Sequence, residues 1–258
     1  MSAVGQSPGG DPRLAEPRGT LGTVRNAVLL LDMLTDGPAY QHLTDLAERS
    51  GLSVPTVHRL LRSLVLADLV EQDPRSSRYS LGPEVARLSQ RYLGRLPVLG
   101  ALSPYLASLR DTLDATIHVS VLVRSSVVYV DRIDAGDGGP YRDSHRVVAA
   151  LSTASGRLLA ARASDEMWGQ CVKEYDGELG DAPDSLRADW AGAAHLVMAG
   201  QSMGAAGEVA VAVLDAAEHP VAALSASMRS AADADVVEEM GTHLARAARA
   251  AGRTLGHG

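Results

Sequence analysis

Apolar positions from Val24 onward recur with the spacing of an amphipathic helix. Residues three or four positions apart share one helix face, and here they are Val24, Ala27, Val28, Leu31 and Leu34. Asp36-Gly37-Pro38 follows and ends the helix. A second, shorter helix begins at Leu43, with Leu46 and Ala47 on its apolar side. It stops at Gly51, a residue type that adopts the left-handed cap without strain.

A third helix is predicted to start two residues after Gly51. Ser53 is a residue type that caps helices, and Pro55 falls in the first turn, where its missing N–H does no harm. The apolar side of this helix consists of Val57, Leu60, Leu61 and Leu64. Two short strands, Leu69–Gln72 and Arg78–Leu81, follow around a turn at 73–77. The order helix, helix, tight turn, helix, hairpin predicts a winged helix-turn-helix.

The remaining pattern alternates hairpins with helices. A helix over Glu84–Leu96, closed by Pro97, is a plausible connection between domains. The expected elements after it are helices at 99–113, 154–163, 164–174, 184–199 and 233–253 and strands at 116–123, 127–133, 208–214 and 221–227, with a Gly/Asp-rich loop at 134–144. This alternation predicts an α+β domain, an antiparallel sheet covered by helices.

The pattern divides the chain into four parts. Residues 1–20 are rich in proline and glycine and have almost no large apolar side chain, so we interpret them as a flexible arm. The winged helix-turn-helix is expected over 21–83 and the linker helix over 84–97. An effector-binding and oligomerisation domain is expected over 98–258.

Charged residues are distributed unevenly between the N-terminal and C-terminal parts of the chain. The net charge of −7 argues against a nucleic-acid partner. However, residues 21–95 hold nine arginines and eight acids, whereas residues 96–258 hold 13 basic residues and 21 acids. The first part is therefore free to approach phosphates, although a balance of +1 permits DNA binding without demonstrating it.

Cysteine content and hydropathy exclude several classes of protein. Cys171 is the single cysteine, which rules out an internal disulfide and a multi-thiolate metal site. No apolar run approaches the roughly 18–20 residues that cross a bilayer, and residues 1–20 lack the apolar core of a signal peptide. We therefore expect a soluble, cytoplasmic protein without cofactor, metal or membrane partner.

The third helix and the hairpin carry the candidate DNA contacts. In a helix-turn-helix the second helix of the motif enters the major groove and presents its N-terminal residues to base edges. The outward positions of this helix are Ser53, Pro55, Thr56, His58, Arg59, Arg62 and Ser63, and those of the wing are Arg75, Ser77 and Arg78. Thr56 suits a thymine methyl and Arg59 a guanine or a phosphate. An ordinary solvated helix face is the alternative for any one of these residues.

These residues resemble the IclR-type bacterial transcriptional regulators. The resemblance rests on 23–27, Leu43-Thr44-Asp45-Leu46-Ala47, 51–61 and Tyr79-Ser80-Leu81-Gly82-Pro83, and further along on 127–132, Ala154-Ser155-Gly156-Arg157 and 221–227. It implies a DNA-binding dimer, often paired into a tetramer, with a GAF-like effector domain. It also implies operator DNA as partner, with repression rather than activation as the direction of regulation, and a small catabolite as effector.

The resemblance also implies where the effector binds. The corresponding positions are Ala154, Ser155 and Gly156 at a helix start and Ser225 and Ser227 on a late strand. Two hydroxyls on one strand face could both bond a carboxylate, and N–H groups at the helix start could add anion affinity. The two serines could equally be strand serines with local hydrogen bonds. Tyr129 and His118 either approach this pocket or are structural.

The sequence departs from the family pattern upstream of the serine pair. Members that bind small acids carry an Asp and a Cys there, and the corresponding positions are about Met198 and Glu208. The Gly/Ala-rich segment between Gly200 and Gly207 leaves this register open by a few residues. A carboxylate at Glu208 would repel an anionic ligand unless an arginine or a proton intervened. This favours a neutral, hydroxylated or cationic effector.

An enzyme is the main alternative, and the motifs do not favour it. The eight histidines are scattered without metal-ligand spacing, and there is no Walker loop, dinucleotide fingerprint or nucleophile elbow. A metabolic enzyme with an accessory winged helix, or a winged helix used for protein–protein contact, remains as a second interpretation. We expect a regulator and no enzyme.

Overall fold

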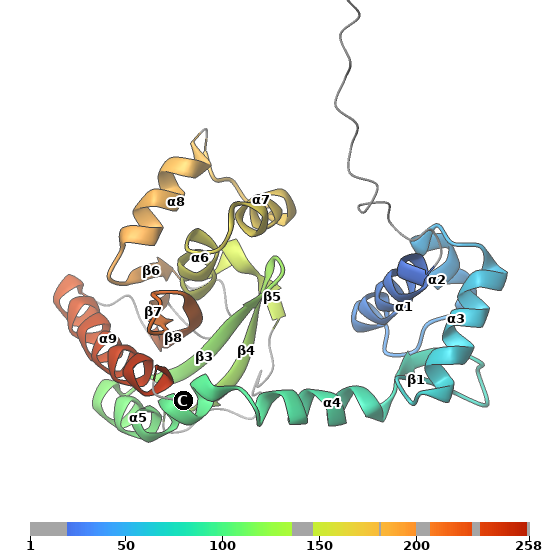
Figure 1. The fold of residues 1–258 in the computed structure, drawn as a ribbon, viewed down its shortest axis with the longest axis horizontal. Coiled ribbons are helices and arrows are strands. Elements are labelled where there is room, and N and C mark those ends of the chain that lie inside the picture. The colour runs from blue at the N-terminus through green and yellow to red at the C-terminus, as the bar shows by residue number, and fades with distance from the viewer. Residues whose placement is uncertain (1–19, 136–146, 181, 200–206, 229–232, 257–258) are drawn as a thin grey trace, which may run out of the picture. The chain divides into compact units, whose positions relative to one another are not determined.

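The computed structural model describes residues 20–135, 147–180, 182–199, 207–228 and 233–256 (Figure 1). The chain divides into two compact units, one ending at Tyr92 and the other beginning at Leu93. The predicted flexible arm lies outside the described residues except for its last position, Thr20, and so does most of the predicted loop at 134–144.

The first unit is a winged helix-turn-helix, as the sequence predicts. Its elements are α1 (Thr20–Thr35), α2 (Leu43–Ser50), α3 (Val54–Leu66), β1 (Val70–Gln72), β2 (Tyr79–Leu81) and α4 (Pro83–Leu93). Gly51 has a φ of 67°, the left-handed conformation that ends α2 and lets α3 start three residues later. The strands pair antiparallel with Val70 opposite Leu81.

The core of this unit comes from the apolar face of each helix. Leu30, Leu46, Val57 and Leu61 are fully buried, and each such side chain contributes roughly 1.5–3 kcal/mol of hydrophobic free energy. Because these residues lie on the inward faces of α1, α2 and α3, their burial fixes which side of α3 faces outward.

A buried glutamine joins three parts of the unit. The Gln41 side chain donates through Nε2 to the carbonyls of Met33 and Asp36, at 2.9 and 2.8 Å, and accepts from Arg49 at 2.6 Å. Its backbone also exchanges two hydrogen bonds of 2.8 Å with Tyr79 of β2. The end of α1, the end of α2 and the wing are therefore held by one residue that the sequence analysis did not single out.

The second unit is an α/β domain around a curled antiparallel sheet. Its elements are α5 (Pro97–Leu113), β3 (Thr116–Val123), β4 (Ser126–Ile133), β5 (Val147–Ala149), a short 3-10 helix (Ala150–Ser152), α6 (Ala154–Ala161), α7 (Asp165–Glu174), α8 (Pro183–Gly192), β6 (Leu196–Ala199), β7 (Gly207–Leu214), β8 (Pro220–Met228) and α9 (Ala234–Leu255). The strand order is β5-β4-β3-β8-β7-β6. Helices α5 and α9 lie on one side of the sheet and α6, α7 and α8 on the other (Figure 1).

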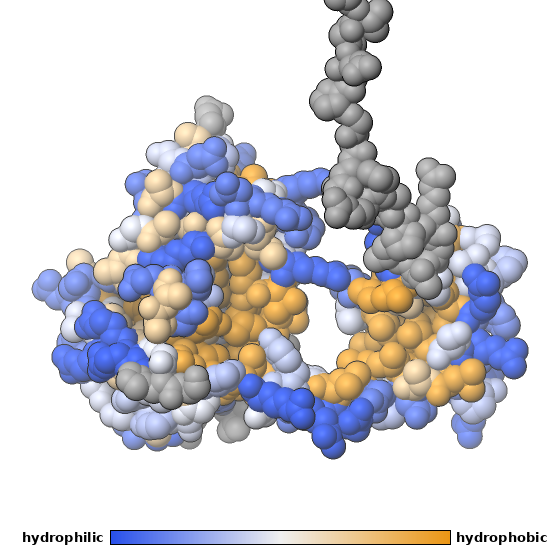
Figure 2. Space-filling view, viewed as in Figure 1, coloured by the Kyte–Doolittle hydropathy of each residue, from blue (hydrophilic) through white to orange (hydrophobic). Residues whose placement is uncertain are grey.

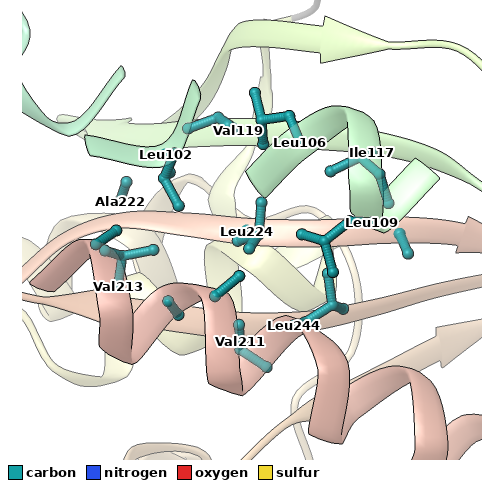
Figure 3. Packing of buried hydrophobic residues seen from close by; sticks show 14 of the residues in the cluster. Leu102, Leu106, Leu109, Ile117, Val119, Val211, Val213, Ala222, Leu224 and Leu244 are labelled. Atoms are coloured by element: carbon teal, nitrogen blue, oxygen red, sulfur yellow. The ribbon is translucent and has the colours of Figure 1, made fainter. Parts of the chain in front are cut away.

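The two faces of the sheet differ in chemistry. Alternate residues of β3, β7 and β8 point to opposite faces. The apolar set, which includes Val119, Val211 and Leu224, packs against Leu106 of α5 and Leu244 of α9 (Figure 3). The alternate set carries the polar residues of these strands and faces α6, and we call it the polar face; it consists of Thr116, His118, Ser120, Glu208, Ala210, Ala223, Ser225 and Ser227.

Two expectations about elements were wrong, and one short strand was missed. The helix predicted over 184–199 is α8 followed by the strand β6, which pairs with β7. The linker helix ends at Leu93 rather than Leu96, and Pro97 opens α5 instead of closing α4. Strand β5 was not predicted, because three residues are too few to show alternation.

Candidate nucleic-acid interface and effector site

The outward side of α3 is open to solvent over its whole length. Its inward residues Val57, Leu60, Leu61 and Leu64 are buried. Figure 2 shows hydrophilic residues along the side of α3 that it displays. The predicted DNA contacts are exposed, apart from the half-buried Thr56; they are Ser53, Pro55, His58, Arg59, Arg62 and Ser63. This set, with Thr56, is called the α3 face below.

Hydroxyls and guanidinium groups of the α3 face differ in how they are bonded. Ser53 occupies the N-cap position, but its side chain makes no bond to the helix backbone and instead pairs with the Thr56 hydroxyl at 2.8 Å. Ser63 donates to the Arg59 carbonyl at 3.0 Å. Within the described part of the chain, no ion pair holds the Arg59 or Arg62 guanidinium. Both cations therefore remain available to an external anion.

The wing turn is organised by Asp73. Its carboxylate accepts from the backbone N–H of Arg75 at 3.2 Å and of Ser76 at 3.0 Å, and also from the Ser76 hydroxyl. The hydrogen bond from the Ser76 hydroxyl, followed by those from the backbone, lowers the pKa of the Asp73 carboxyl below its usual range. The negative charge is thus held by the turn, while Arg75, Ser77 and Arg78 stay exposed.

The Arg78 side chain has a hydrogen-bond partner in the fold. Its Nε donates to His42 Nε2 at 3.0 Å, across the gap between the wing and the start of α2. Ser77 has a φ of 57°, so the backbone reverses there. Arg75, at the tip, is the wing cation with the most freedom to reach a phosphate.

In the second unit, Glu208 links the polar face to the start of α6. One carboxylate oxygen accepts from the Ala154 N–H at 3.0 Å and the other from the Ser155 hydroxyl at 2.6 Å. Ala154 and Ser155 are fully buried. Since a helix N-terminus favours negative charge, Glu208 is an internal anion placed where the dipole stabilises it.

The sequence-predicted effector residues gather around this contact. Met198 of β6 lies directly opposite Glu208 in the antiparallel pair, and Ser227 of β8 lies opposite it on the other side. His118 bonds Ser227 at 3.0 Å through Nε2, and its ring meets Tyr129 edge to face with 5.2 Å between centroids. The segment 200–206, where the register was open, lies outside the described residues.

Two buried hydroxyls on the polar face lack a partner. Ser225 Oγ and Ser120 Oγ are inaccessible to solvent and make no hydrogen bond to any residue that the structure describes. Ser225 faces His118 across the β3–β8 pair, and Ser120 lies two pairs further along that ladder. An unsatisfied buried hydroxyl costs roughly 1–3 kcal/mol, so these groups favour a ligand or water that supplies the missing bonds.

Two of the predicted effector residues have partners within the fold. Gly156 is packed, because a Cβ there would lie 2.0 Å from the Ala150 oxygen, and its N–H donates to Thr153 at 2.9 Å. The Ala154 and Gly156 N–H groups are thus engaged by Glu208 and Thr153 and are not available to an anionic effector. Ser227 is bonded to His118, whereas the Ser120 hydroxyl has no partner among the described residues. Ser120 was not among the residues predicted from the sequence, although it lies two positions after His118 on β3 and therefore on the same face.

Two cavities of the second unit, both lined by described residues, lie away from these positions. One, of about 580 Å³, is lined by the end of β7 and by α9, with Ala212, Asp215 and Arg249 among its residues. Another, of about 330 Å³, lies between α6, α7 and the start of β8, with Leu159 and Met167. None of the predicted effector residues lines either cavity.

Within the described ranges no three His, Cys, Asp or Glu side chains are grouped as metal ligands. Every helix there is too short or too polar to span a bilayer.

Comparisons with known proteins find similarity to bacterial transcriptional regulators. Residues 23–74 match the model of the IclR helix-turn-helix domain. The glycerol operon regulatory protein of Streptomyces coelicolor is 31% identical over 145 residues, which are 54% of this chain and 55% of that protein. The chain thus matches about half the length of such curated relatives.

Solved structures extend the likeness to the fold of both units. An IclR transcriptional regulator from Alicyclobacillus acidocaldarius superposes with a TM-score of 0.71 at 24% identity, covering 91% of this chain and 99% of that one. An IclR homologue from Microbacterium hydrocarbonoxydans, complexed with 4-hydroxybenzoate, gives 0.65 at 19% identity, covering 90% and 99%. At these identities the structures establish the fold alone.

Proposed function

For a chain that carries a helix-turn-helix domain of the IclR type and has the fold of IclR regulators, we propose the function of a DNA-binding transcriptional regulator controlled by a small molecule. The observation that carries this proposal is the open α3 face, where the Arg59 and Arg62 guanidinium groups extend into solvent beside the wing. Were this side of α3 buried, the proposal would fail.

In the proposed complex, α3 lies in the major groove of operator DNA. Thr56 and Arg59, near its N-terminal half, meet base edges, and Arg62 and Ser63 meet the backbone. Arg75, Ser77 and Arg78 of the wing contact flanking phosphates or the minor groove. Sequence is read by α3, whereas the wing adds affinity that does not depend on sequence.

The effector acts on the second unit, at the polar face near Glu208. The unsatisfied Ser120 and Ser225 hydroxyls support this placement, and a protein of the same fold holds a small molecule. We assign the regulator a homodimeric state, with a dimer of dimers as the larger form, and repression as its direction. Effector binding then changes operator affinity through a coupling between the two sites.

The test is duplex binding by the full chain at several salt concentrations. The duplex is one that the wild-type protein selects from a random library. Affinity should fall steeply with salt, as counterion release requires. Arg59→Ala should cost about tenfold or more in affinity for the selected duplex, since a good base contact is worth about 1–3 kcal/mol.

Arg25→Ala is the matched control, because Arg25 is an exposed arginine on α1 of the same unit. It removes the same charge and should leave discrimination between selected and random duplexes intact. Binding that ignored salt, or an Arg59→Ala variant that bound the selected duplex normally, would contradict the proposed interface.

A further inference from the structure

The negative charge at the polar face bears on which effector it can accept. Glu208 fills the start of α6 with the chain's own carboxylate, bonded to Ala154 and Ser155. A ligand carboxylate arriving beside it would meet a like charge and find these two donors occupied. A hydrogen-bond donor would meet an oriented acceptor with lone pairs to spare.

The arginines next to the polar face are also engaged. Arg132, opposite His118 on β4, bonds the Asp134 carboxylate through Nε at 2.6 Å. Arg157, in the first turns of α6, donates to the Leu151 carbonyl at 2.8 Å and stacks on the Trp190 ring with 4.7 Å to its centroid. These two guanidinium groups are thus engaged with partners within the fold.

The buried hydroxyls give an independent indication of a ligand. Ser120 and Ser225 lie on the face that α6 covers, and neither Oγ has a partner among the described residues. A hydroxyl both donates and accepts, so it complements amide, hydroxyl or amidine groups without a charge requirement. Glu208 is the residue of the polar face that carries a carboxylate, so it favours a positive over a negative charge on the ligand.

We propose that this site selects an uncharged or cationic hydrogen-bond donor and excludes carboxylates, with Glu208 as the specificity-determining residue and Ser120 and Ser225 as ligand contacts. The proposal rests on the proposed function for the location of the effector site. It does not depend on DNA binding, so the two can fail separately.

Three isosteric probes test the charge preference directly. Acetate, acetamide and acetamidinium have nearly the same shape and carry charges of −1, 0 and +1. Their dissociation constants for the full chain are measured by ligand-observed NMR at constant ionic strength. Acetamidinium should bind best and acetate worst, with about a tenfold difference, because hydrogen bonds to charged groups are the strong ones.

Variants of the protein test whether Glu208 causes this charge preference. Glu208→Gln keeps an acceptor for Ala154 and Ser155 but removes the charge, and it should abolish the ranking of the three probes. Glu178→Gln removes one charge from an exposed position and should leave the ranking unchanged. Ser225→Ala should weaken all three probes alike.

Each contrary outcome is decisive. Acetate binding as tightly as acetamidinium to the wild-type protein overturns the proposal, and so does a ranking that survives Glu208→Gln. Failure of all three probes to bind at tens of millimolar overturns it as well. Loss of DNA binding by Arg59→Ala, measured separately, would then still support the proposed function.

Discussion

The Glu208 carboxylate has a structural role in the fold, and we propose a role in specificity for it as well. It ties β7 to the start of α6 through two hydrogen bonds, so it fixes the helix against the polar face. The sequence predicted that a carboxylate at this position would repel an anionic ligand. It could not indicate the partners, because Ala154 and Ser155 are more than fifty residues away and only the fold brings them together.

Cys171 is a residue whose chemistry the fold suppresses. Its thiol is buried and lies 3.9 Å from the Arg124 carbonyl. Burial, and then the nearby Glu174 carboxylate, raises the pKa of the thiol above its usual value. Less thiolate is present at a given pH, and thiolate is the reactive form.

We therefore predict that Cys171 does not react with a disulfide reagent at pH 8 in the folded protein. One thiol per chain should appear after unfolding in guanidinium chloride. A Ser185→Cys variant, at an exposed position on α8, serves as the positive control and should react at once. Rapid labelling of the native wild-type chain would show that the Cys171 thiol is accessible in the folded protein.

At the level of elements, the pattern predicts long helices and hairpins well and short strands poorly. Helices α1 to α3 and the hairpin of β3 and β4 repeat a clear period over enough residues to be recognised. Strand β6 has four residues, and only three residues separate it from the end of α8. Its apolar positions therefore extend the helical spacing of α8 along the sequence. Pairing with β7 decides its conformation, and that contact is tertiary.

Helix α6 can be tested through its glycine. A Cβ at Gly156 would lie 2.0 Å from the Ala150 oxygen and 2.7 Å from Val127 Cγ2, and neither atom has room to move. Gly156→Ala should lower the free energy of unfolding of the second unit by about 3 kcal/mol or more.

The matched control for this substitution is Gly169→Ala in α7. Nothing lies within 4 Å of the Cβ that it adds, so the helix propensity of alanine should stabilise by up to about 1 kcal/mol. Denaturant unfolding measures both changes. Equal effects of the two substitutions would mean that α6 does not pack closely on Ala150.

The wing turn makes a prediction about pH. The folded-state pKa of Asp73 is lowered, chiefly by the Ser76 hydroxyl. The contribution of the carboxylate to the turn is therefore complete above the ordinary aspartate pKa and is lost as pH falls through the lowered folded-state value. Amide exchange at Arg75 and Ser76 should quicken over that acidic window.

Asp73→Asn should show quickened exchange at these two amides already at neutral pH, since an amide oxygen accepts more weakly than a carboxylate. Asp36→Asn, at an exposed position of the same unit, should leave both amides unchanged. A carboxyl carbon titration by NMR gives the Asp73 pKa itself. A value at or above that of a model aspartate would remove the basis of this prediction.

At the scale of the whole molecule, each unit has its own core and its own charge. The core of the first unit draws on residues between Leu30 and Tyr79, and the main core of the second on residues from Val98 to Ala251. The acidic excess belongs to residues 96–258, so the first unit does not share it.

Separate cores predict separate unfolding. Leu61→Ala, at a fully buried site of α3, should lower the stability of the first unit by about 2–5 kcal/mol and leave that of the second within about 0.5 kcal/mol. Leu244→Ala in α9 should do the reverse. Scanning calorimetry of the full chain, with amide exchange to assign each transition, measures both. If either substitution moved the two transitions together, the units would unfold as one cooperative body, and the proposed division between a DNA-binding unit and an effector-binding unit would need another physical basis.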